Sequence, residues 1–323
     1  MNSFGRNFRI NVFGESHGAI MGVTLDGVPP GIDINIEDFQ EDIERRKPGK
    51  KGTTPRVESD QPRFVSGVFN GKTTGAPLTM LFENSNTRSE DYAKTREYYR
   101  PGHADFVASQ KFKGFEDYRG GGHFSGRLTI LIVCAGVIAK KILGLPIEAK
   151  LIEIAGESDL DKGLQKGIDA KDSVGGIVEC RVNQIPVGWG EPFFDSVESV
   201  LAHAMFAIPA IKGVEFGAGF GATKMFGSEH NDNIIDEKGK TDTNNAGGIV
   251  GGITNGNEIV FRVAVKPTSS IGKTQETWNH ETHQIGEFSV KGRHDLCIAL
   301  RVPVVVEAMT AISLLDLKMQ AGR

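Results

Sequence analysis

Residues 128–143 are apolar almost all the way round when they are placed on a helix. A helix that has no polar face is buried inside a protein rather than laid on its surface. Its uninterrupted part, residues 128–139, is shorter than the roughly 20 apolar residues that a membrane span requires. Arg127 and the pair Lys140-Lys141 close this stretch at its two ends. The sequence therefore predicts a globular fold around a buried helix.

Other periodic segments predict what surrounds this helix. Asn70-Gly71 separates two strand-like runs, at 64–69 and 73–82, and Asn-Gly supplies the positive φ of a type I′ hairpin turn. Further strands are expected at 8–13, 23–28, 174–182, near Val214 and at 259–265. Helices are expected at 36–47, 197–208 and 304–317, the second of them with an N-cap at Asp195. Residues 84–120 show no clean period. This mixture, without repeats or long linkers, predicts an α+β fold in one continuous domain, residues 1–323.

Composition narrows the class of protein. The formal net charge is -4, which argues against a general nucleic-acid binder. The N-terminus carries Arg6 and Arg9 with no apolar segment behind them, so a secretory signal is not expected. Three cysteines, none in a C-x-x-C pair, cannot make a disulfide framework. The expectation is a cytoplasmic protein.

Glycine and arginine are distributed unusually. The chain contains 41 glycines, so many backbone positions take positive φ or allow a ligand to come close. Eleven of the 16 arginines lie at or before Arg127, although the whole chain is acidic. The planar guanidinium suits carboxylates and phosphates. A small polyanionic ligand explains this concentration better than a nucleic acid does.

Several segments resemble known ligand-binding motifs but lack a feature that each motif requires. Gly272-Lys273-Thr274 resembles the end of a phosphate loop, but the required upstream glycine position holds Pro267. Residues 217–222 fit a relaxed dinucleotide fingerprint, but the following segment is polar and does not predict the helix that such a site needs. His280 and His283 have no cysteine or carboxylate pair to complete a metal site. No metal is expected.

Two histidines lie on turns where acid–base chemistry is possible. His17 follows a predicted strand within Gly14-Glu15-Ser16-His17-Gly18, and His103 lies between a Pro-Gly turn and Asp105. A histidine there could donate a proton, because its pKa lies near neutrality. The first pattern fits a polar turn equally well, and the second is a weak signal on its own.

The remaining candidates suit anion binding. Residues 119–127 read RGGGHFSGR and open the buried helix, where free amides and a Ser125 cap attract anions. Residues 45–51 are strongly basic, which fits either a lid over an anion or a solvated loop. Residues 266–270, KPTSS, offer hydroxyls after a strand, and Arg293-His294-Asp295 groups three ionisable side chains.

Together these blocks resemble the chorismate synthase family. The matching segments cover nearly the whole chain in order: FGESHG at 13–18, DGVPPGI at 26–32, RRKPG at 45–49, YRPGHAD at 99–105, DYRGGGHFSGR at 117–127, PVGWGEPFFD at 186–195, IPAIKGVEFG at 208–217, NNAGGIVGGITNG at 244–256, KPTSSI at 266–271 and GRHDLC at 292–297. The resemblance implies a lyase that converts 5-enolpyruvylshikimate 3-phosphate to chorismate and phosphate by 1,4-elimination. It also implies a β-α-β sandwich with helices between antiparallel sheets, and a homotetramer.

The resemblance further implies roles for individual residues. His17 is the expected acid for the leaving phosphate, His103 the histidine that protonates reduced flavin, and Asp295 the carboxylate that relays a proton. Contacts to reduced FMN are expected at His123, Phe124, Ser125, Pro209, Ala210, Gly251, Lys266, Pro267, Thr268, Ser269, Ser270 and Arg293. Substrate or NADP contacts are expected at Ser16, Arg46, Arg119 and Arg127. NADPH would act only indirectly, and reduced flavin would come from an external source, because no reductase domain is visible.

The chain departs from the family pattern in two places. Leu296 stands where the family commonly has proline, and residues 144–173 are shorter than the corresponding region. The rival interpretation is a non-catalytic flavin- or phosphate-binding protein. The joint presence of His17, His103 and Asp295 argues for catalysis, because binding alone would not need them.

Overall fold

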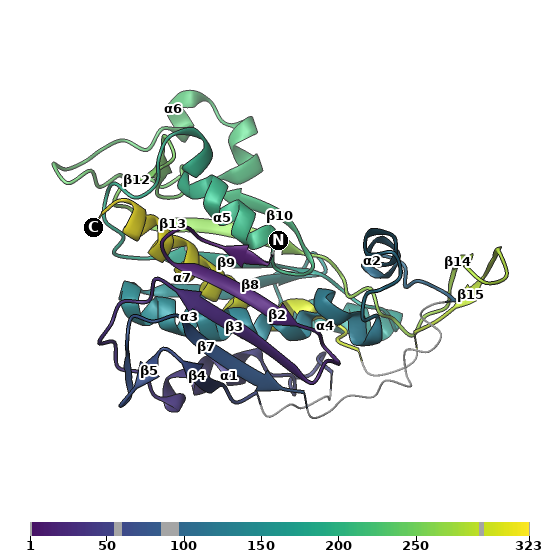
Figure 1. The fold of residues 1–323 in the computed structure, drawn as a ribbon. Coiled ribbons are helices and arrows are strands. Elements are labelled where there is room, and N and C mark those ends of the chain that lie inside the picture. The colour runs from purple at the N-terminus through teal and green to yellow at the C-terminus, as the bar shows by residue number, and fades with distance from the viewer. Residues whose placement is uncertain (1, 55–59, 85–96, 291–293, 323) are drawn as a thin grey trace.

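One face of the molecule is an antiparallel sheet from the N-terminal part of the chain (Figure 1). The computed structural model describes residues 2–54, 60–84, 97–290 and 294–322. The sheet has the strand order β1 (Ser3–Phe4), β2 (Arg9–Gly14), β3 (Ile20–Asp26), β7 (Leu78–Glu83) and β4 (Arg63–Ser66). The expected hairpin at Asn70-Gly71 is present between β5 (Val68–Phe69) and β6 (Lys72–Thr73), with positive φ at both turn residues.

A second antiparallel sheet comes from the C-terminal half. Its order is β10 (Ile211–Phe216), β13 (Ile259–Val265), β9 (Gly176–Val182) and β8 (Ile147–Ile154). Val178, Cys180, Phe261 and Val263 are completely buried and alternate with more exposed residues, as expected for a sheet with one face on the core.

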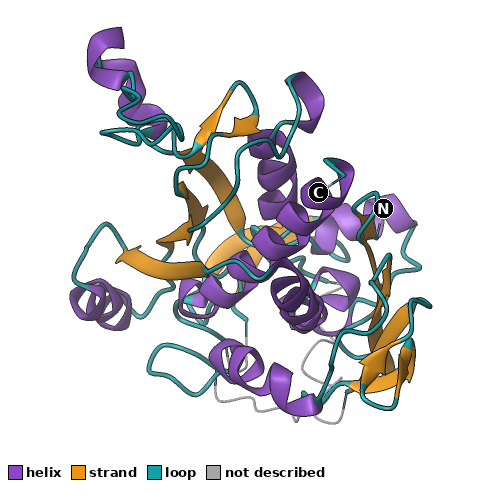
Figure 2. Ribbon diagram, turned by 90° about the vertical axis from the view of Figure 1, so that its left-hand side faces the viewer, coloured by secondary structure: helices purple, strands orange, loops and turns teal. Residues whose placement is uncertain are grey.

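Helices fill the space between the two sheets (Figure 2). The buried helix expected from the sequence is α3 (Thr129–Leu143), which packs on β2 and β3. Its partner α7 (Pro303–Gln320) packs on β8 and β9, and α3 and α7 pack against each other. The shorter helices α1 (Gln40–Arg46) and α5 (Val197–Phe206) contact α7 from the side. The expected β-α-β sandwich of an α+β fold is confirmed.

Smaller elements extend from this sandwich. They are α2 (Asp105–Phe112), α4 (Leu160–Ala170), α6 (Gly227–His230), the hairpin of β11 (Ile249–Val250) and β12 (Ile253–Thr254), and the hairpin of β14 (Gln275–Asn279) and β15 (Gln284–Phe288). Figure 1 places α6 and the β14–β15 hairpin at opposite ends of the molecule. Among the described residues, no helix combines the length and hydropathy that crossing a membrane requires. The three cysteines are buried and free.

Three local predictions need correction. The helix expected at 36–47 begins as a 3-10 turn, Ile36–Phe39, before α1. The N-cap of α5 is Ser196, whose hydroxyl accepts from the Ser199 amide, while Asp195 pairs with Arg6 instead. The segment without a clean period contains α2, which has no apolar stripe, since Phe106, Val107 and Phe112 are all exposed.

Candidate active site

A cavity of about 860 Å³ lies where the two halves of the fold meet. Its walls come from segments far apart in the sequence: the end of α1, the turn before α2, the loop that opens α3, the region between α5 and β10, the loop after β13, and the segment before α7. Lining residues that the sequence singled out are Arg46, His103, His123, Phe124, Ser125, Arg127, Pro209, Ala210, Lys266, Pro267, Thr268, Ser269, Ser270 and Asp295. Its size falls within the range of about 300–1,000 Å³ that ligand sites usually have.

His103 is held in place by the residues around its turn. Its Nδ1 lies 2.6 Å from Asp105 Oδ1, so the contact expected from the motif is present. Arg100 donates to both oxygens of Asp105, at 2.7 Å each. Burial by itself would raise the pKa of Asp105, but hydrogen bonds from Arg100 and His103 outweigh it and hold that pKa well below its usual range. Asp105 is therefore an ionised partner that orients the imidazole.

Two successive glycines let the loop before α3 pass close to both histidines. Gly120 and Gly121 have φ of +60° and +81°. A Cβ at Gly120 would lie 2.2 Å from the His17 ring, and one at Gly121 would lie 3.0 Å from Cε1 of His103. His17 is buried, and Ser16 Oγ lies 3.1 Å from its Nδ1. His17 thus lies directly behind Gly120, which lines the cavity.

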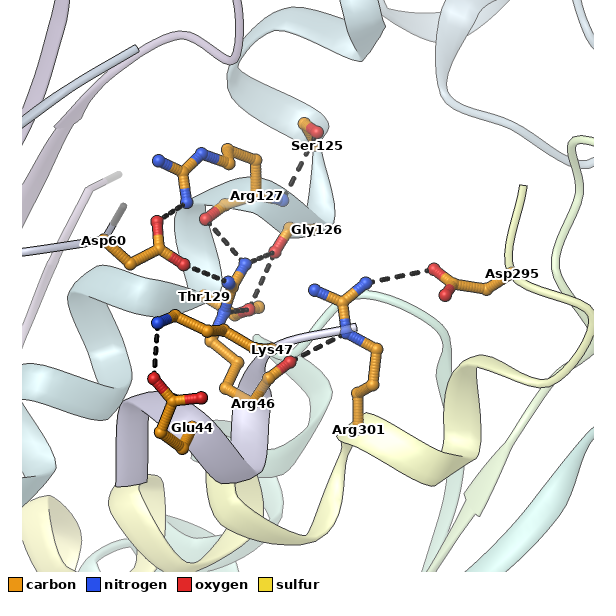
Figure 3. A network of polar contacts seen from close by, with 10 residues as sticks. All are labelled: Glu44, Arg46, Lys47, Asp60, Ser125, Gly126, Arg127, Thr129, Asp295 and Arg301. Atoms are coloured by element: carbon orange, nitrogen blue, oxygen red, sulfur yellow. Dashed lines mark hydrogen bonds and ion pairs between the residues drawn. The ribbon is translucent and has the colours of Figure 1, made fainter. Parts of the chain in front are cut away.

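Arg46 and Arg127 meet at the start of α3 (Figure 3). Asp60 lies between them and forms an ion pair with each guanidinium. All three side chains are almost completely buried. Burial lowers the pKa of Arg46 to about 9, and the nearby positive charge of Arg301 adds to the effect. This end of the cavity is therefore a buried cationic cluster with one internal carboxylate.

Asp295 is fixed from two sides. Its Oδ1 accepts from the Thr54 amide at 2.9 Å, and its Oδ2 accepts from Arg301 Nη1 at 3.1 Å. Arg301 also donates to the Arg46 carbonyl, so one guanidinium links Asp295 to the end of α1 (Figure 3). The neighbouring Leu296 donates its N–H to the Gly52 carbonyl, a bond that a proline at this position could not make.

The KPTSS loop lies against the turn that carries His103. Lys266 Nζ donates to the Gly102 carbonyl and to Ser269 Oγ, and Ser270 Oγ accepts from Arg100 at 3.2 Å. Burial and the positive charge of Lys212 lower the pKa of Lys266. Both lysines line the cavity, together with apolar side chains that include Phe124, Ile208, Ile298, Val302, Val305 and Met309. The cavity thus combines cations with an apolar wall.

Of the expected site residues that the structure describes, four do not line this cavity: His17, which lies behind Gly120, and Gly251, Arg119 and Ser16. Gly251 lies at the turn of the β11–β12 hairpin, where its φ of +62° serves the turn. Arg119 is half-exposed and donates two hydrogen bonds to Asp117. Ser16 lies behind the loop with His17. Arg293 lies outside the described residues.

The sequence analysis missed Asp60 and Arg301, which hold the predicted residues in place. Neither belongs to a local pattern, because each has a decisive partner that is distant in sequence: Asp60 pairs with Arg127, and Arg301 bonds to Arg46 as well as to the nearby Asp295.

Comparisons with known proteins agree on one family. The chorismate synthase family model matches residues 8–319. A chorismate synthase from Chitinophaga pinensis is 68% identical over 98% of this chain and 96% of its own length, and one from Dehalococcoides mccartyi is 46% identical over 99% and 97%. A crystal structure of chorismate synthase superposes with a TM-score of 0.73 at 25% identity, covering 98% of this chain and 93% of that one. With a family model that spans most of its length and relatives this similar over nearly all of it, the chain belongs to the chorismate synthase family.

Proposed function

We propose that this protein converts 5-enolpyruvylshikimate 3-phosphate to chorismate and phosphate by 1,4-elimination, with reduced FMN as its cofactor. The observation that carries the proposal is the convergence in one cavity of His103, Asp295 and the buried guanidinium of Arg127. The substrate carries two carboxylates and a phosphate, and the reaction moves a proton. A binding protein would need the cations but not an imidazole and a carboxylate that are both fixed by hydrogen bonds.

The cavity also suits a flavin mononucleotide. Its apolar wall fits a planar ring system, and Lys212 and Lys266 offer positive charge for a phosphate. Residues 123–125, 209–210 and 266–270, expected to contact FMN, all line the cavity. Reduced flavin supplies electron density and a proton-accepting nitrogen when it is bound. We propose that it comes from an external source, with NADPH only as a distant reductant.

Each polar side chain then has a task. His17, behind Gly120, gives a proton to the leaving phosphate. His103, oriented by Asp105, would supply a proton to a bound reduced flavin. Asp295, held by Thr54 and Arg301, accepts the proton that originates from the substrate ring and carries it away. Arg127 binds an oxyanion of the substrate.

For Arg46 the geometry supports a different task from the expected one. Its Nε donates to Thr129 Oγ1, and its Nη2 donates to the carbonyls of Gly126 and Arg127. With Nη1 on Asp60, four of its five N–H groups are committed to the protein. Arg46 therefore supports the site rather than binding the ligand with a free fork.

We also propose that the chain is a single cytoplasmic domain that assembles as a homotetramer. One continuous cluster of buried apolar residues runs from Phe8 to Leu317 and joins both sheets. Phe193, Phe194, Phe220 and Phe226 are each more than three-quarters exposed, and such aromatics are typical of subunit interfaces. Light scattering coupled to size-exclusion chromatography measures the assembly, and a monomeric mass would contradict it.

The deciding experiment is anaerobic turnover with photoreduced FMN, followed by the absorbance of chorismate. The unaltered protein should form chorismate, and Asp295→Asn should keep FMN and substrate binding while single-turnover formation falls by orders of magnitude. Asparagine keeps the size of the side chain but cannot accept a proton. Binding of both ligands without any chorismate from the unaltered protein would favour the non-catalytic alternative, and near-parental turnover of the variant would remove Asp295 from the relay.

A further inference from the structure

Asp60 is a buried carboxylate whose two oxygens serve two different arginines. Its side chain is 2% exposed, Oδ2 lies 3.3 Å from Arg46 Nη1, and Oδ1 pairs with Arg127 Nη1 (Figure 3). Its φ of +51° lies in the left-handed region, which costs energy for a residue other than glycine. A strained backbone and a buried charge are kept together only where the surrounding contacts hold them. Here those contacts are the two guanidiniums.

Arg46 and Arg127 differ in how many of their N–H donors are already bonded to the protein. Arg46 is bound to the start of α3 through Thr129, Gly126 and the Arg127 carbonyl. Because Arg46 is fixed in this way, it acts as an anchor for Asp60. Asp60 in turn holds one corner of the Arg127 guanidinium.

The opposite edge of Arg127 is unused. Within the part of the chain that the structure describes, its Nε and Nη2 are buried and have no hydrogen-bond partner. The Arg127 side chain is 7% exposed and lines the cavity. Nε and Nη2 form one edge of the fork, the arrangement that binds carboxylate or phosphate with two parallel hydrogen bonds. Buried donors without partners are costly, so a ligand oxyanion explains why this edge is left open.

We propose that Asp60 is a positioning residue: by holding Nη1 of Arg127 it presents the Nε–Nη2 edge to a phosphate or carboxylate oxygen pair in the cavity. This inference deepens the proposed function and rests on it for the identity of the natural ligand. The carboxylate has a second effect, because it separates two like charges that would otherwise repel each other in a buried space. Asp60 also lines the cavity, and its proposed part is to hold Arg127 rather than to bind the anion.

The test uses inorganic phosphate as the probe and a double-mutant cycle on the full chain. Asp60→Asn should weaken phosphate binding about tenfold in calorimetry, and Arg127→Ala should weaken it at least as much. Adding Asp60→Asn to Arg127→Ala should cause no further loss, because Asp60 acts only through Arg127. Purely structural damage would instead add to the loss in the double variant. With the natural substrate, Asp60→Asn should raise KM about tenfold with a much smaller effect on kcat.

Asp42→Asn is the matched control. Asp42 lies on the same helix as Arg46 but pairs with Arg45 and Lys140, away from Arg127. It should leave phosphate affinity within twofold of the parent. If Asp60→Asn does not fold, Thr129→Val removes the acceptor of Arg46 Nε without changing any charge, and it should weaken phosphate binding in the same direction by a smaller factor.

Two results would overturn the inference. Phosphate binding that is unchanged or tighter in Asp60→Asn would mean that the carboxylate competes with the anion. If the unaltered protein does not bind phosphate, the Nε–Nη2 edge of Arg127 is not an anion-binding site. Neither result depends on turnover, so failure here is separate from failure of the unaltered protein to form chorismate.

Discussion

The two central helices, α3 and α7, lie close together at Gly136 of α3. A Cβ built there would lie 2.3 Å from Ala308 Cβ and 2.5 Å from Ala308 Cα on α7. Both helices are buried between the sheets, and the obstructing atoms include backbone, so a rotamer change cannot relieve the contact. Gly136→Ala must push the helices apart.

The magnitude follows from two opposing effects. Alanine is favoured over glycine in a helix interior by about 1 kcal/mol. Overpacking a dense core costs about 1–3 kcal/mol, and the backbone contact places this site at the upper end. We expect a net loss of about 2 kcal/mol in the free energy of unfolding, and a larger loss for Gly136→Val.

Urea unfolding followed by circular dichroism measures this loss as a lower midpoint with an unchanged slope. Gly227→Ala is the control: Gly227 lies in α6 with nothing within 4 Å of a built Cβ, so it should be neutral or slightly stabilising. A Gly136→Ala protein as stable as the parent would refute the reasoning, because it would show that α3 and α7 are not packed at this distance.

Three further predictions concern other parts of the molecule. Burial alone would raise the pKa of Glu307, but hydrogen bonds from Arg45 and the charge of Lys140 outweigh it and lower that pKa. In acid the unfolded chain therefore binds more protons than the folded one, so the free energy of unfolding should fall as pH drops below about 4.3. Glu307→Gln should make this loss in acid less steep and should lower the free energy of unfolding at pH 7. An acid limb of the same steepness in the variant would contradict this. Gly120→Ala should leave the circular dichroism spectrum unchanged but cut chorismate formation at least about tenfold. The new Cβ would displace His17, and a general acid contributes about 10²–10⁴-fold to the rate. Full activity of this variant would argue against the placement of His17 behind Gly120. The Asp316 carboxylate accepts hydrogen bonds from the backbone amides of residues 6–8. Asp316→Ala should therefore lower the free energy of unfolding, measured by urea titration, by about 3 kcal/mol. A loss under about 1 kcal/mol would mean that these hydrogen bonds do not hold the N-terminal segment in place.

Much of the fold could be predicted from local patterns. The apolar stretch at 128–143 has only one stable location, inside the protein, and it became α3. Asn70-Gly71 fixed a turn because these two residues accept the positive φ that the hairpin needs. The Pro-Gly turn at His103 also encoded its own contact, since Asp105 is only two residues away. In each case the residues that determine the structure are neighbours in the chain.

The tertiary structure decided the rest of the site. Helix α2 has no apolar stripe from which it could be predicted. The N-cap of α5 is Ser196, while Asp195 pairs with Arg6, which is 189 residues away in the sequence. Likewise, nothing local to Asp60 indicates that it joins Arg46 to Arg127. Local sequence fixes dihedral preferences and the period of burial, whereas the partner of a buried charge depends on which distant segments the packed core brings within hydrogen-bond distance.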